Sequence, residues 1–134
     1  MNSGLISVFT RYINFKMGLA GAVVMGSIIF AINYDFGWSG AGIAAAKQGL
    51  YTFFFGGMVV RLCETISLSF RSKWISVLLA CLIPTIVATI AVFSVHSIKG
   101  TPLPMESTLP TLILSVPGFL AIGLRKRNTS LEKS

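Results

Sequence analysis

Apolar residues along the chain fall into long windows separated by short polar stretches, which is the pattern of membrane-spanning helices. A helix needs roughly 20 apolar residues to cross a hydrocarbon core about 30 Å thick. Three such windows are clear: residues 17–34 and 74–95 carry no charge, and residues 103–124 carry only Glu106, near the start. The pattern therefore predicts at least three transmembrane helices.

A fourth apolar window covers residues 41–70, and its register is ambiguous. A span over the first two thirds buries Lys47, whereas a span over the last two thirds buries Arg61 and Glu64. Each charge buried at the centre of a span costs about 2.5 to 3.5 kcal/mol on insertion scales. We therefore expect one long tilted helix across the whole window, with Lys47 near one interface and Arg61 and Glu64 in the opposite third.

Residues 1–16 predict a short amphipathic helix that lies at the membrane surface. At 100° per residue, apolar side chains fill one half of the helical wheel and polar side chains fill the other. The apolar half holds Leu5, Ile6, Val8, Phe9, Tyr12, Ile13 and Phe15, and the polar half holds Ser7, Thr10, Arg11 and Asn14. The alternative interpretation is that this segment lengthens the first span.

The expected fold class is an all-α membrane protein with four transmembrane helices and a short N-terminal amphipathic interfacial helix. The amphipathic segment takes residues 1–16, the transmembrane domain residues 17–124, and a basic cytoplasmic tail residues 125–134. The spans are expected at about residues 17–34, 41–70, 74–95 and 103–124. The tail lacks an apolar period, so we expect it to be solvated, with the basic run 125–127 acting as a stop signal for insertion.

Composition supports this class, because 54% of the 134 residues are apolar and only 11% are charged. Soluble domains carry about 25% charged residues. The net charge of +7 does not indicate nucleic acid on so apolar a chain, since basic loop residues also orient membrane proteins. The lipid bilayer is therefore the expected partner, and no nucleic acid is expected.

The eleven Lys and Arg residues are distributed unequally over the predicted topology. Four spans place both termini on one side of the membrane, and that side holds nine of them, whereas the other side holds Lys47 and Lys99. The nine are Arg11, Lys16, Arg61, Arg71, Lys73, Arg125, Lys126, Arg127 and Lys133. The positive-inside rule then predicts cytoplasmic termini, and we expect an integral protein of a bacterial inner membrane.

Small residues form a candidate helix-packing surface. Gly18, Ala22 and Gly26 recur every four residues in the first span and make a smooth ridge, and Gly56 and Gly57 lie in the second span. Helices in membranes associate through close packing of such faces. We therefore expect these positions to mark contacts between the first two spans or between protomers.

Pro84 and Pro117 lie in the middle of the third and fourth spans. Each removes a backbone hydrogen bond and predicts a helix kink. The freed carbonyls can line a polar cavity, as in transporters with broken helices. Proline is also common in membrane helices without such a role, so both interpretations remain open.

Arg61 and Glu64 are the best candidates for a polar site inside the membrane, with Lys47 as a third member. Ionisable residues within a span tend to face protein or a water-filled cavity. Arg61 and Glu64 are three residues apart and can pair on one helix face, and regular periodicity places Lys47 on the same side. The alternative interpretation is a neutralised pair near the inner interface, with Arg61 extending toward the headgroups.

No residue pattern indicates catalysis, a metal site or a cofactor. His96, the single histidine, lacks partners at metal-ligand spacing. Cys63 and Cys81 form no Cys-x-x-Cys motif and are expected to be free thiols. The four acidic residues accompany no activated nucleophile, so an enzyme is the least favoured class.

Two function classes remain. In the favoured one, the chain is a small multi-spanning membrane protein that acts as a non-catalytic interaction or accessory subunit. Its small-residue helix faces pack against a second copy or against a membrane-protein partner. In the alternative, it is a small homo-oligomeric transporter or channel with Arg61 and Glu64 lining the path. The first is favoured because each notable feature already has a structural explanation.

Overall fold

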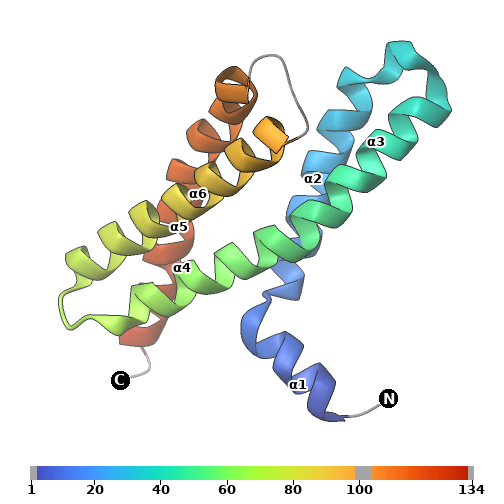
Figure 1. Cartoon of the computed structure of the whole chain (residues 1–134). Coiled ribbons are helices and arrows are strands. Elements are labelled where there is room, and N and C mark those ends of the chain that lie inside the picture. Colours follow the sequence, from blue (N-terminus) through green and yellow to red (C-terminus); the bar gives the residue numbers. More distant parts are fainter. Residues whose placement is uncertain (1–2, 99–103, 133–134) are drawn as a thin grey trace. The chain divides into compact units, whose positions relative to one another are not determined.

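The computed structural model describes residues 3–98 and 104–132, which are almost entirely helical (Figure 1). The α-helices in this part of the chain are α1 (Ser3–Tyr12), α2 (Phe15–Ile32), α3 (Gly37–Tyr51), α4 (Gly57–Ser69), α5 (Lys73–Ile98) and α6 (Pro104–Leu131). A 3₁₀ turn, Tyr34–Phe36, joins α2 to α3, and a π-helical turn, Thr52–Gly56, joins α3 to α4.

Four helical segments are long and apolar enough to cross a membrane, which confirms the predicted number of long apolar helices. Among the described residues they are Phe15–Ile32, Gly37–Ser69, Lys73–Ile98 and Thr108–Leu131. The second is one continuous helical segment of 33 residues, as expected for a single long helix across this window. At 1.5 Å per residue, this helix is about 50 Å long.

α1 is a helix of its own, because the chain changes direction between α1 and α2 (Figure 1). Asn14 has an extended backbone, and its side-chain oxygen accepts a hydrogen bond of 3.1 Å from the N–H of Met17. A side-chain oxygen in this position caps a helix N-terminus. The capping residue therefore separates the two helices, and the N-terminal segment does not lengthen α2.

α6 extends further than the sequence predicts, since it continues to Leu131 instead of ending near residue 124. Arg and Lys are good helix formers, and neither Gly nor Pro follows Gly123 to end the helix. The hydroxyl of Thr129 also donates to the carbonyl oxygen of Arg125 at 2.9 Å. Helical structure therefore includes most of the predicted tail.

Contacts divide the chain into two compact units, Met1–Arg61 and Leu62–Ser134. In the first unit, α2 packs along α3 and along the π turn. In the second unit, α5 packs along α6 (Figure 1). α4 begins in the first unit and ends in the second.

Candidate functional site

The ridge of small residues on α2 lies against the second long helix of the same chain. A Cβ atom at Gly18 would lie 2.5 Å from the carbonyl oxygen of Phe53, and a Cβ atom at Gly26 would lie 3.4 Å from a carbonyl oxygen of α3. Between these points, a Cβ atom at Gly49 would lie 3.4 Å from the carbonyl oxygen of Ala22. The two backbones thus approach closely along the whole ridge, and the chain itself occupies this surface.

Gly57, where α4 begins, is enclosed by the junction between α1 and α2. A Cβ atom there would lie 2.7 Å from Cγ2 of Ile13 and 3.2 Å from the carbonyl oxygen of Asn14. The N–H of Asn14 donates to the carbonyl oxygen of Gly57 at 3.0 Å. A Cβ atom at Gly56 would meet only the side chain of Thr52, in its own turn. Of the two candidate glycines, Gly57 makes the close interhelical contact.

Sequence periodicity does not predict the π turn, and this turn changes the predicted polar face. It brings the ring centroid of Phe53 to 5.6 Å from that of Phe15 on α2. A π turn adds one residue to a helical turn, which rotates the following helix by about 100°. Lys47 and Arg61 therefore do not share the face that regular periodicity predicts, and their Cα atoms are separated by about 21 Å along the helix.

Arg61 joins α4 to α1. Its Nη2 donates to the carbonyl oxygen of Thr10 at 2.8 Å. Thr10 lies in the last turn of α1, where carbonyl groups lack intrahelical partners and the helix dipole favours a cation. Arg61 thus caps the C-terminus of α1, which gives its guanidinium a structural role within the first unit.

The two other predicted polar residues lie on α3 and on α4. Lys47 is exposed on α3. Glu64 is half-buried on α4, one turn after Arg61, and its backbone carbonyl accepts a hydrogen bond of 2.7 Å from the hydroxyl of Ser67. The structure therefore spreads the three residues along α3 and α4, with Arg61 and Glu64 as neighbours on one helix.

Small and polar side chains fill the contact between α5 and α6. The buried residues of α5 are Ser76, Val77, Ala80, Cys81, Pro84, Thr85 and Ala88. From α6, Gly123 approaches so closely that a Cβ atom there would lie 3.4 Å from Cβ of Ala80. Pro84 belongs to this buried face, whereas Pro117 is exposed on α6. Both helices continue through their prolines, so neither proline ends a span.

Both cysteines are buried free thiols. The thiol of Cys81 donates to the carbonyl oxygen of Val116 at 3.3 Å, and the thiol of Cys63, on α4, donates to the carbonyl oxygen of Phe119 at 3.5 Å. Thiols are weak donors. Two such bonds nevertheless connect α4 and α5 to the same stretch of α6, within the second unit.

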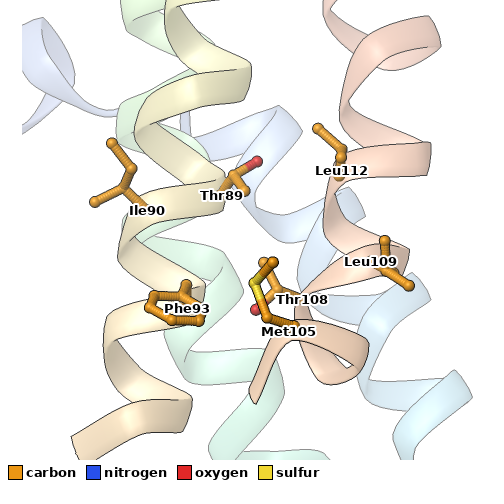
Figure 2. Close-up of a pocket in the computed structure, with 7 residues that line it drawn as sticks. All are labelled: Thr89, Ile90, Phe93, Met105, Thr108, Leu109 and Leu112. Carbon is orange, nitrogen blue, oxygen red and sulfur yellow. The ribbon is translucent and has the colours of Figure 1, made fainter. Parts of the chain in front are cut away.

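A pocket of about 230 Å³ lies between the second half of α5 and the first turns of α6 (Figure 2). Its lining consists of Thr89, Ile90, Phe93, Met105, Thr108, Leu109 and Leu112. Among the residues that the structure describes, the buried hydroxyls of Thr85 and Thr89 have no hydrogen-bond partner. The pocket therefore combines largely apolar walls with the hydroxyls of Thr89 and Thr108, a combination that suits an apolar group. The sequence contained no motif that singled it out.

Arg127 is a structural residue that sequence analysis treated only as part of a basic run. Its Nη2 donates to the carbonyl oxygen of Arg71 at 2.8 Å, and its Nη1 donates to the carbonyl oxygen of Ser67 at 3.5 Å. These bonds satisfy carbonyl groups where α4 ends. Arg127 lies four residues after the buried Gly123, so both residues lie on the same face of α6. This spacing is the sequence signal that indicates an inward position for Arg127.

The geometry offers no metal centre: residues 3–98 and 104–132 contain no group of three His, Cys, Asp or Glu side chains that could hold a metal ion. Comparison with known proteins gives no match to the chain, whether with protein-family models, curated proteins or solved structures. The functional interpretation therefore depends on the packing, charge and exposure of the chain's own residues.

Proposed function

We propose that this chain is an integral membrane protein of four spans. The supporting observation is that its long apolar helices remain largely uncovered. Only 6% of the apolar window of α2 is buried, and Leu19, Val23 and Val24 are each more than half exposed. Soluble proteins rarely expose continuous apolar surfaces of this kind, whereas a bilayer solvates them and leaves helical backbone hydrogen bonds intact.

The proposal includes an orientation, with both termini in the cytoplasm of a bacterium and the spans in its inner membrane. Nine of the eleven Lys and Arg residues lie on the side of the termini in this topology. On α1, Phe9 and Tyr12 are exposed apolar side chains next to the basic Arg11. This arrangement supports a position of α1 in the inner headgroup layer.

Single-cysteine labelling tests the orientation. In a variant with Cys63 and Cys81 replaced by alanine, a cysteine at Lys126 is expected to react with a membrane-impermeant maleimide only after the cells are permeabilised. A cysteine at Lys99 is expected to react in intact cells. Reaction at Lys126 in intact cells would contradict the proposed orientation, and equal reaction at both positions would contradict a single topology.

Within the membrane, we propose that the protein is a non-catalytic interaction or accessory subunit. The small-residue ridge of α2 already packs inside the chain, and Arg61 already caps α1. α2 is the least covered of the four long helices, and Val24 lies exposed on its face opposite the ridge. This face supports binding of a membrane-protein partner, because helix association in lipid depends on such packing surfaces.

Photo-crosslinking at native expression tests this role. A photoreactive residue at Val24 is expected to give an adduct with one other membrane protein. Ile86 on α5 is the matched control, because it is similarly exposed but lies on the span that the chain covers most, and it is expected to give no protein adduct. An adduct with the mass of two copies only, together with solute flux in liposomes that Glu64→Gln abolishes, would instead establish the transporter alternative.

A further inference from the structure

Two basic segments that are distant in sequence meet at one end of the second unit. Arg71 and Lys73 lie where α4 is followed by α5, and Arg125, Lys126 and Arg127 lie near the end of α6. The hydrogen bond from Arg127 to the carbonyl oxygen of Arg71, 2.8 Å long, fixes these segments side by side. The structure thus brings five cations to one end of the second unit, and we name them the basic end.

The basic end keeps a net positive charge after the nearby acids are counted. Glu64, on α4, and Glu132, after α6, are the acids of this unit nearest to it among the described residues, and Glu106 lies at the opposite end of α6. Five cations against these two carboxylates leave a net charge of +3. The guanidinium of Arg127 is engaged with backbone carbonyls, while Arg71 and Arg125 are exposed.

Aromatic side chains accompany these cations. Trp74 is 71% exposed, and Nζ of Lys73 lies 5.6 Å from the centre of its ring. Phe70, in the turn before α5, is also exposed. Exposed tryptophan next to lysine is typical of the headgroup layer, where the ring is partly solvated and the ammonium group meets lipid phosphates.

We propose that the basic end binds anionic phospholipid headgroups of the cytoplasmic leaflet through their phosphate groups. The sequence run 125–127 alone contains three cations, fewer than the four to eight typical of anionic-lipid sites. The structure reaches that range because Arg71 and Lys73 join the run. Arg127 acts as a positioning residue that holds the two segments together. This inference rests on the proposed membrane location of the chain.

Quenching of Trp74 by brominated lipid measures this preference directly. Trp38→Phe leaves Trp74 as the single tryptophan, and the full chain is reconstituted in phosphatidylcholine vesicles that contain brominated phosphatidylglycerol or brominated phosphatidylcholine. Brominated phosphatidylglycerol is expected to quench Trp74 at much lower mole fraction. The double substitution Arg71→Gln and Lys73→Gln is expected to reduce this preference by roughly thirtyfold. It leaves the Arg71 carbonyl, and therefore its bond with Arg127, in place.

A matched double variant distinguishes a local lipid-binding site from general electrostatic attraction to an anionic membrane. Arg11→Gln with Lys16→Gln removes the same charge from the proposed cytoplasmic side but from the first unit, and it is expected to leave the preference at Trp74 unchanged. Equal losses in both double variants would overturn the proposal. Displacement of the brominated lipid by inorganic phosphate, at constant ionic strength, would overturn it in favour of a soluble phosphate ligand.

The same measurement distinguishes failure of this proposal from failure of the membrane assignment. Equal quenching of Trp74 by both brominated lipids would place the tryptophan in a bilayer without a preference for anionic headgroups, which overturns the lipid site alone. Absence of quenching by either lipid would overturn both the site and the integral membrane location on which it rests.

Discussion

Replacement of Gly18 by alanine is expected to lower the free energy of unfolding by about 1 to 3 kcal/mol, the usual effect of overpacking a close contact. The new Cβ atom would lie 2.5 Å from the carbonyl oxygen of Phe53. This oxygen belongs to the backbone of the π turn, so it cannot rotate away as a flexible side chain would. α2 must then move away from the π turn, which weakens the contact between the rings of Phe15 and Phe53.

Reversible unfolding in mixed detergent and dodecyl sulfate micelles, followed by circular dichroism, measures this effect. Gly42→Ala is the matched control, because Gly42 lies inside α3 and a Cβ atom there meets no described atom within 4 Å. Alanine is a better helix former than glycine by about 1 kcal/mol, so the control is expected to be neutral or slightly stabilised. A similar response of both variants would show that α2 does not approach the π turn at Gly18.

Much of the fold follows from the sequence because bilayer thickness sets the length of a span. The uncharged windows that contain Gly18 and Pro84 became α2 and α5. A short span over the second window buries either Lys47 or the pair Arg61 and Glu64. Because no short register avoids a buried charge, the sequence indicated one long helix. The small-residue ridge was also visible, but its spacing does not identify the helix that it contacts. Any span or protomer with a small-residue face satisfies the same pattern.

The parts that the sequence did not predict depend on tertiary contacts. The π turn adds one residue to a helix without changing its hydropathy, so a uniform period does not reveal the turn that lies between Lys47 and Arg61. Arg127 was predicted to lie in a solvated tail because charge usually indicates solvent. Carbonyl groups at the end of α4 accept its hydrogen bonds instead, and only the structure places those carbonyls beside α6.

Substitution of Arg61 by methionine is expected to release α1 while the long helices remain folded. Methionine keeps an unbranched apolar stem but removes the donor that binds the carbonyl oxygen of Thr10. A hydrogen bond to a charged group contributes about 1.5 to 3 kcal/mol. Opening of α1 should therefore become about 10 to 100 times more frequent, and the amides of Ser3–Tyr12 should exchange with deuterium faster by the same factor.

Hydrogen exchange followed by mass spectrometry, with the protein in lipid nanodiscs, decides whether this role of Arg61 is correct. Lys47→Met removes the same charge from an exposed position of α3, so it is expected to leave exchange in α1 unchanged. Arg61→Lys keeps the charge on a shorter side chain without the planar guanidinium, and partial protection is expected. If α1 exchanges equally in Arg61→Met and in the native protein, Arg61 does not cap α1, and a role beside Glu64 in a polar path through the membrane becomes the better explanation of its burial.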